Sequence, residues 1–381
     1  MGLTSTSFLV LLAVLTALAM LATLLLWARV PGPGPLRWTG RLAMIALCQL
    51  TAVATVGAWV NNGYGLYASW NDLLGTDASD TVDASMPGPP ARRAQFTPGA
   101  SGTLSTYFRG TRSRLSGEVL VWTPPGYDDP AQRTTRYPVV MLLHGIPGAP
   151  ESWLEHGGMP DAYRRFVDDG TARPALLVMP TIDPGGIDTD CVDTPLRKNA
   201  TWLADDVTEL VAGHFRTLPA PGGWGLMGIS TGGYCAARLP LQYPGTFAAG
   251  VALDPDPLAG DPDVIPDAAL RARTSPLALV KGTKADVSLF LATSRQDRDS
   301  PVGAIEEFAR AAAGTPVRLK TLVVPEGGHN FRTWTGMYPS ALPWLSDRLT
   351  PPAGPDQPTT KSNSVLSPTV PYAPTVQTSI Q

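Results

Sequence analysis

The sequence predicts an α/β protein with a mostly parallel sheet flanked by helices, behind two membrane-spanning helices at the amino end. Three observations lead to this prediction. Two long uncharged apolar stretches lie in the first 60 residues, short branched apolar runs recur between residues 118 and 324, and helix-like stretches separate several of these runs. Strands that alternate with helices along a chain indicate a parallel sheet.

The composition is typical of a folded protein that does not bind nucleic acid. The chain has 381 residues, of which 44% are hydrophobic, and this is ample for one large core. A net charge of −3 leaves no broad basic surface that could neutralise phosphate groups. We therefore expect no nucleic-acid partner.

Residues 7–28 and 42–60 are each long enough to span a membrane. Both stretches are uncharged and apolar, and a helix of about 20 such residues crosses the hydrocarbon core of a bilayer. Arg29, Arg37 and Arg41 lie in the turn that joins them. Because cytoplasmic turns are enriched in Arg and Lys, we expect this turn in the cytoplasm and both ends of the hairpin outside. Both stretches are then in contact with membrane lipid.

The alternative to a retained anchor is a cleaved signal peptide. Such a peptide needs a basic segment before a shorter apolar core, whereas residues 1–6 carry no Lys or Arg. We therefore predict a plasma-membrane protein with two spans, whose remaining domain is extracytoplasmic.

The chain divides into four segments by composition. We expect residues 1–70 to form the transmembrane hairpin and an interfacial segment, 71–104 a flexible linker rich in Pro, Gly, Ser and Asp, 105–350 the folded domain, and 351–381 a disordered tail rich in Pro, Ser and Thr.

Seven apolar runs in the folded domain predict strands that are covered on both faces. They are residues 118–122, 138–143, 175–180, 224–229, 248–253, 287–292 and 319–324. Helices are expected over residues 162–170, 201–215 and 301–314, with Thr201 as the N-cap of the second. In parallel sheets of this kind, binding and catalytic sites lie beyond the carboxyl ends of the strands.

Ser230 lies at such a strand end, in the pattern Gly228-Ile229-Ser230-Thr231-Gly232. It directly follows one predicted strand and precedes a stretch that can start a helix. A serine nucleophile on a sharp strand-to-helix turn needs small residues on both sides, because the strand and the helix approach closely there. The pattern therefore predicts that Ser230 is a nucleophile.

A serine hydroxyl needs a base that takes its proton. The chain has four histidines, and His329 is the one that follows Ser230, just past the last predicted strand. His214 lies toward the opposite end of the strand that carries Ser230, and His144 is expected to shape the loop after an earlier strand. We therefore predict His329 as the base; the alternative is an ordinary loop histidine.

The acid of the triad is expected between the nucleophile and the base, after the penultimate strand. Asp297 and Asp299 both lie there, and Asp297 is nearer the strand end. Asp254, directly after the preceding strand, is a further alternative. We predict Asp297, whose task would be to orient the imidazole and to stabilise its positive form.

The negative charge of an acyl-transfer transition state needs hydrogen-bond donors. One is expected from the backbone N–H of Thr231, the residue after the nucleophile, and the second from the loop over residues 144–153. Ile146 is the predicted second donor, with Gly145 leaving room for the backbone to turn.

The motifs TPPGYDD, YPVVMLLHGIPGAPESW, WLADDV, GISTGGYCA and GGHNFRTW resemble the α/β-hydrolase esterases of the esterase D and mycolyltransferase group. The resemblance covers residues 104–350 and implies an α/β-hydrolase fold. It implies Ser230 as nucleophile, His329 as base and the backbone around Ile146 and Thr231 as oxyanion hole. The hairpin and the segment that follows it also resemble a membrane-anchored actinobacterial subgroup.

The predicted topology places Cys191 and Cys235 in an oxidising compartment, where disulfides persist. Cys191 and Cys235 are therefore a candidate pair; the alternative is two unrelated buried thiols. In proteins of the resembled family, a tie of this kind holds the preceding loop over the active site. Cys48 is expected to be a small apolar filler in the second span.

The loop that contains Cys191 is acidic. Asp183, Asp188, Asp190 and Asp193 could suggest a calcium site, but their spacing does not match an EF-hand loop. We expect a solvated acidic loop and no bound metal.

These features predict a serine esterase that works through an acyl-enzyme on an ester or acyl-lipid substrate, without metal or cofactor. One alternative is an acyltransferase that moves the acyl group to a sugar or lipid hydroxyl of the cell envelope. A peptidase and a non-catalytic envelope scaffold are further alternatives. The sequence does not predict the oligomeric state.

Overall fold

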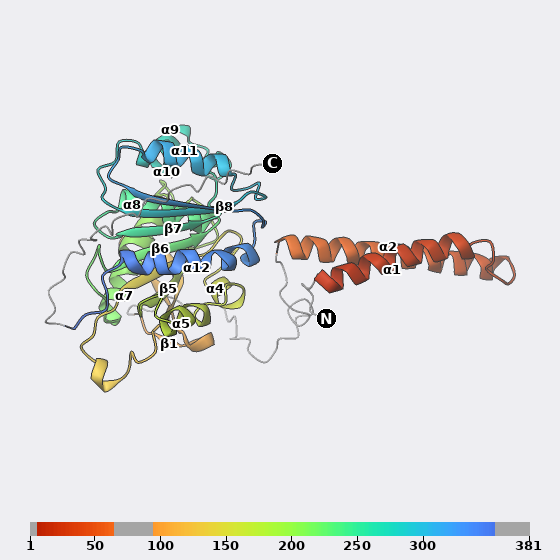
Figure 1. Cartoon of the computed structure of the whole chain (residues 1–381), viewed down its shortest axis with the longest axis horizontal. Helices are drawn as coiled ribbons and strands as arrows, with labels where there is room; N and C mark the ends of the chain where they lie inside the picture. The colour runs from red at the N-terminus through yellow and green to blue at the C-terminus, as the bar shows by residue number, and fades with distance from the viewer. Residues whose placement is uncertain (1–5, 65–93, 355–381) are drawn as a thin grey trace, which may run out of the picture.

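The computed structural model describes residues 6–64 and 94–354. They form a helical hairpin and a domain built around one nine-stranded sheet (Figure 1). The predicted interfacial residues after the hairpin, most of the predicted linker and residues 355–381 of the predicted tail lie outside the described residues.

The hairpin consists of α1 (Thr6–Leu26) and α2 (Gly34–Tyr64), which run side by side (Figure 1). Hydroxyl groups of Thr16 and Thr55 lie 3.0 Å apart between the helices. Both helices are long and apolar enough to cross a membrane. Of the most apolar stretch of each helix, 0% in α1 and 6% in α2 is buried inside the protein. Their large apolar side chains therefore face outward.

The nine strands occur in the spatial order β1-β2-β3-β5-β4-β6-β7-β8-β9. They are β1 (Thr97–Pro98), β2 (Leu104–Arg109), β3 (Ser116–Trp122), β4 (Val139–Leu143), β5 (Leu176–Pro180), β6 (Trp224–Ile229), β7 (Ala249–Leu253), β8 (Ser288–Ser294) and β9 (Arg318–Val324). From β5 to β9 all neighbours are parallel. All seven predicted strands are present, and the α/β fold class is confirmed. The prediction that each is covered on both faces is wrong for β9, which ends the strand order and has no buried residue.

The first two strands differ from the prediction. β1 lies inside the stretch predicted as a linker, residues 71–104, and it pairs with β2. β2 is a half-buried strand in which only Thr106 and Phe108 are buried. Because polar residues alternate with these two, the strand shows no continuous apolar run. The folded domain therefore begins before residue 105.

The other boundary also shifts. Arg136 and Ala353 exchange backbone hydrogen bonds of 2.9 and 3.1 Å. The first residues of the predicted tail, 351–354, thus lie against the folded domain.

Helices cover both faces of the sheet. They are α4 (Ser152–Glu155), α5 (Asp161–Asp168), α6 (Asn199–Thr201), the π-helical segment η3 (Trp202–Val207), α7 (Thr208–His214), α8 (Thr231–Gln242), α9 (Ala268–Thr274), α10 (Pro276–Val280), α11 (Val302–Ala312) and α12 (Phe331–Arg348). The three expected helices are present. The N-cap prediction is wrong, because Thr201 is inside a helix and donates its hydroxyl to Asp193 Oδ2 at 2.6 Å.

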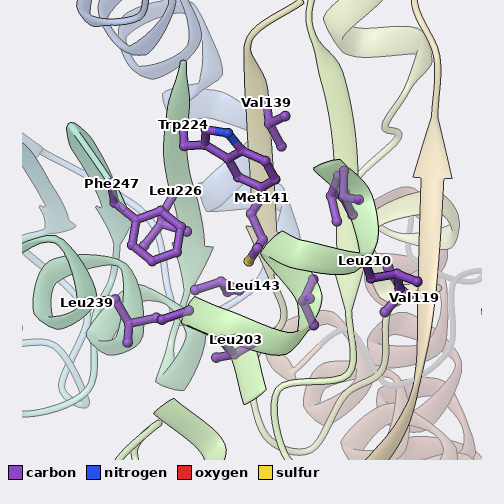
Figure 2. Close-up of a cluster of buried hydrophobic side chains, with 14 of the residues drawn as sticks. Val119, Val139, Met141, Leu143, Leu203, Leu210, Trp224, Leu226, Leu239 and Phe247 are labelled. Carbon is purple, nitrogen blue, oxygen red and sulfur yellow. The ribbon is translucent and has the colours of Figure 1, made fainter. Parts of the chain in front are cut away.

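Alternate residues of the central strands build two separate cores. Val139, Met141 and Leu143 of β4 point to one face, where they pack with Leu226 and with helix residues such as Leu239 (Figure 2). Their neighbours Val140 and Leu142 pack on the other face with residues of α5 and α12. Because both faces are buried, the strands read as unbroken apolar runs. This arrangement brings the carboxyl ends of β6, β7 and β8 to one edge of the sheet.

Candidate active site

Ser230 occupies a sharp turn between β6 and α8. Its φ is 54° and its ψ is −125°, a backbone conformation that residues other than glycine rarely adopt. A Cβ atom on Gly228 would lie 1.9 Å from the carbonyl oxygen of Gly232, and one on Gly232 would lie 2.1 Å from that of Leu143. The flanking glycines therefore let the helix start directly against the sheet, which presents Ser230 at the strand end.

The structure brings Ser230, His329 and Asp297 together in a linear relay. His329 Nε2 lies 2.8 Å from Ser230 Oγ, and His329 Nδ1 lies 2.8 Å from Asp297 Oδ2. With the hydroxyl donating to Nε2, Nδ1 carries the ring hydrogen and donates to the carboxylate. This is the protonation state that a base for Ser230 requires.

Asp297 is held by donors on its second oxygen. Asp297 Oδ1 accepts hydrogen bonds from the backbone N–H groups of Asp299 at 2.8 Å and of Ser300 at 3.0 Å. The side chain of Asp299, an alternative acid in the sequence, is exposed. Asp297, and not Asp299, is therefore the carboxylate that is hydrogen-bonded to His329.

His329 and Asp297 have opposite pKa shifts. Burial alone would lower the pKa of His329, but the hydrogen bond and the charge of Asp297 outweigh burial and raise it. Burial alone would raise the pKa of Asp297, but the hydrogen bond and charge of His329 and the two backbone donors lower it. The pair therefore favours an ionised Asp297 and stabilises a protonated imidazole.

Asp254, the remaining alternative acid, makes no hydrogen bond to His329. Its Oδ2 accepts a hydrogen bond of 2.8 Å from Nε1 of Trp334, whose ring stands edge-on to His329 at 5.2 Å. Burial, with a further contribution from the charge of Asp297, raises the pKa of Asp254 to about 7. Asp254 is therefore close to the relay without being part of it.

The segments of both predicted oxyanion donors adjoin the nucleophile. Thr231 is the first residue of α8, where N–H groups have no intrahelical acceptor. The loop that contains Ile146 approaches from β4, and a Cβ atom on Gly145 would lie 3.0 Å from that of Ser230. The arrangement thus allows backbone donors to converge beside Ser230.

Comparison with known families agrees with this geometry. The family model "Esterase" matches residues 116–345, more than half of the chain. The chain belongs to this esterase family. An uncharacterized protein of Corynebacterium glutamicum is 28% identical over 135 residues, which are 35% of this chain and 31% of that protein. The match therefore spans about a third of the curated relative.

Solved structures share the fold. A ferulic acid esterase has a TM-score of 0.55 at 20% identity and covers 67% of this chain and 98% of its own. An S-formylglutathione hydrolase from Agrobacterium tumefaciens has a TM-score of 0.54 at 18% identity, covering 68% and 99%. A fluorophosphonate-binding serine hydrolase of Staphylococcus aureus has a TM-score of 0.51 at 15% identity, covering 67% and 99%. These likenesses establish the α/β-hydrolase fold of this esterase.

His144 supports the loop that contains Gly145 and Ile146. Its Nδ1–H donates to the carbonyl of Gly145 at 2.7 Å, and its Nε2 accepts from the backbone N–H of Ile182 at 3.1 Å. Burial lowers the pKa of His144 to about 4, so the ring stays neutral and can both donate and accept. The side chain ties two loops together at the sheet edge.

Asp256 is a site residue that the sequence analysis missed. Its Oδ1 lies 3.2 Å from Ser230 Oγ, and its Oδ2 accepts a hydrogen bond of 2.6 Å from the Thr231 hydroxyl. Burial raises the pKa of Asp256. Its place three residues beyond β7, at the carboxyl ends of the strands, is the signal that could have identified it.

Cys191 and Cys235 form a disulfide, with Cα atoms 5.6 Å apart. The bond joins the acidic loop to α8, five residues after the nucleophile. The expectation of a solvated acidic loop is wrong for Asp190, which is 1% exposed and whose pKa is raised to about 8 by burial and by neighbouring carboxylates. The disulfide thus fixes part of the loop inside the esterase domain.

The described residues also line a cavity of about 550 Å³ at the opposite edge of the sheet. Its lining includes Arg136, Asp205 and Trp224, the first residue of β6. Ser230 follows the last residue of the same strand, so this cavity is separate from the relay of Ser230, His329 and Asp297.

Proposed function

We propose that this protein is a membrane-anchored, extracytoplasmic serine esterase that uses Ser230, His329 and Asp297 through an acyl-enzyme. The observation that carries the proposal is the relay of two 2.8 Å contacts that ends on a strained serine. Membership of the esterase family supports the reaction class.

In the first half of the reaction, Ser230 Oγ attacks the carbonyl carbon of the ester. The Oγ proton passes to His329 Nε2, and the negative charge moves to the carbonyl oxygen. The N–H groups of Ile146 and Thr231 donate to this oxygen. Asp297 stays ionised and stabilises the imidazolium that forms.

Collapse of the tetrahedral intermediate then expels the alcohol, which takes the proton from His329 Nε2. The acyl group remains on Ser230 Oγ. In the second half, His329 takes a proton from water, the resulting hydroxide attacks the acyl carbon, and His329 returns the proton to Ser230 Oγ. The products are an alcohol and a carboxylic acid.

We propose a carboxylic ester or an acyl-lipid as the substrate. The printed names of the similar structures, a ferulic acid esterase and an S-formylglutathione hydrolase, support acyl chemistry at a site of this fold.

Two features support the anchor and its orientation. Leu24 of α1 is 79% exposed, and such an apolar surface requires an apolar environment. The predicted turn is shorter in the structure, because α2 already begins at Gly34. Arg29 lies in the turn, whereas Arg37 and Arg41 lie in the first turns of α2, where Nε of Arg41 donates to the backbone carbonyl of Trp27 at 3.2 Å. A basic turn in the cytoplasm places the domain outside, where the Cys191–Cys235 bond is stable.

The proposal is tested by labelling the full chain with a fluorophosphonate probe, followed by mass mapping of the adduct. We expect one adduct, on Ser230. The variant Ser230→Ala should lose the label and should lower the hydrolysis of an ester by at least about 10³-fold. Labelling at the wild-type rate in this variant would refute the assignment of the nucleophile.

A further inference from the structure

A second carboxyl group lies beside the catalytic histidine. One oxygen of Asp254, one oxygen of Asp297 and one ring nitrogen of His329 all lie within 4.8 Å of one another. The two carboxyl groups come from neighbouring strand ends, since Asp254 follows β7 and Asp297 follows β8. The imidazole therefore faces two acids, although it is hydrogen-bonded to only one.

The two carboxyl groups differ in the number of hydrogen bonds that their oxygens accept. Asp297 accepts three hydrogen bonds, from His329 and from two backbone N–H groups. Asp254 is 0% exposed, and among the described residues its Oδ2 has Trp334 as a donor while its Oδ1 has no hydrogen-bond partner. Because a buried carboxylate oxygen without a donor is costly, Asp297 carries a negative charge more readily than Asp254 does.

Trp334 links Asp254 to the histidine. Its Nε1 donates to Asp254, and its ring stands at 89° to the His329 ring with centroids 5.2 Å apart. Trp334 belongs to α12, which begins two residues after His329. The same indole therefore holds the second carboxyl group and limits the movement of the imidazole.

We propose that Asp254 is a second positioning acid of the catalytic site, which stabilises protonated His329 and replaces Asp297 when that residue loses its charge. The inference rests on the proposed function. When Ser230 Oγ bonds the carbonyl carbon, its proton moves to His329 Nε2, and neither aspartate takes a proton from the ring. In the wild type, Asp297 balances most of the charge of the imidazolium and Asp254 contributes the smaller part; without the charge of Asp297, Asp254 balances it.

The charges around His329 support this exchange. The ionisable groups that raise the pKa of His329 are Asp297, Asp254 and Asp256. After burial, the charge of Asp297 is the next cause that raises the pKa of Asp254. Neutralising Asp297 removes that repulsion, so Asp254 ionises more readily and can take over.

The test compares Asp297→Asn, Asp254→Asn and the double variant in the full chain, with hydrolysis of a neutral ester as the readout. Loss of a sole buried acid costs about 10⁴-fold in such triads. We expect Asp297→Asn to lose about 10- to 100-fold, Asp254→Asn less than about tenfold, and the double variant on the order of 10⁴-fold. Equal losses of about 10⁴-fold in Asp297→Asn and the double variant would overturn the proposal.

A pH profile separates this role from a purely structural one. Asparagine at position 254 keeps an oxygen that can accept from Trp334 Nε1, so only the charge is lost. We expect the fall of kcat/KM at acidic pH, the acid limb, to move to lower pH in Asp254→Asn. The control is Glu306→Gln, which removes the same charge from an exposed position on α11. In this control we expect the acid limb to stay in place. An unmoved limb in Asp254→Asn contradicts the proposal.

Two controls keep the outcome interpretable. If Asp297→Asn does not fold, the pKa of His329 is measured by NMR in Ser230→Ala with and without Asp254→Asn, and an unchanged value overturns the proposal. If the wild type fails to react with the fluorophosphonate probe, the proposed function itself is wrong. A labelled wild type with a fully inactive Asp297→Asn refutes only the role of Asp254.

Discussion

At the scale of single residues, the site depends on glycines that no other residue can replace. We expect Gly232→Ala to abolish labelling of Ser230 and to lower the free energy of unfolding by about 3 kcal/mol or more, because its Cβ would overlap backbone oxygens of β4 and the following residue. Gly245→Ala is the matched control, since a Cβ there meets no atom within 4 Å. Denaturant unfolding measures both changes. Near-wild-type stability of Gly232→Ala would contradict the close approach of α8 to the sheet.

The pKa of His329 sets a second residue-scale prediction. The base must be neutral to accept the Ser230 proton, and its pKa is raised in the folded protein. Activity is therefore present above that raised value and is lost as the pH falls through it. We expect the acid limb of kcat/KM to lie above about 6.5, the ordinary value for histidine. A limb at or below that value, measured with an uncharged ester, would show that Asp297 does not outweigh burial.

The same scale explains which site residues could be predicted. Ser230 has glycines at defined offsets, and His329 is the one histidine that follows it, so both were evident in the sequence. Asp256 was not evident, because it is one of several aspartates after β7 and its direction depends on the loop conformation. The acid required the structure, since only the hydrogen bond to His329 separates Asp297 from Asp254.

At the scale of elements, the central strands covered on both faces were predictable, whereas β1 and β2 at one side of the sheet were not. The central strands read as unbroken apolar runs because helices bury both of their faces. β2 buries only alternate residues, and its remaining polar residues resemble those of the adjacent linker. Its place in the sheet depends on pairing with β3, which local sequence does not encode.

The disulfide allows a prediction about one of these elements. It closes a loop over a sequence separation of 44 residues and joins the acidic loop to α8. Cross-linking a loop of this length stabilises by up to about 4 kcal/mol through the unfolded chain. We expect Cys191→Ala/Cys235→Ala to lower the unfolding free energy by about 2–4 kcal/mol. A reductant should destabilise the wild type alone; equal sensitivity of the double variant would indicate another cause.

At the scale of the whole molecule, we expect the hairpin and the esterase domain to have separate tasks. The hairpin exposes an apolar surface, whereas the catalytic relay lies wholly within residues 230–329. We expect the full chain to remain in the membrane fraction after high-salt washing, and a variant without residues 1–64 to be soluble with an unchanged rate of fluorophosphonate labelling. On the proposed topology, with the basic turn in the cytoplasm and the domain outside, protease added to intact spheroplasts should cleave the domain. Cleavage only after lysis would place the domain in the cytoplasm, and a truncated chain that still sediments with membranes would show that the hairpin is not the anchor.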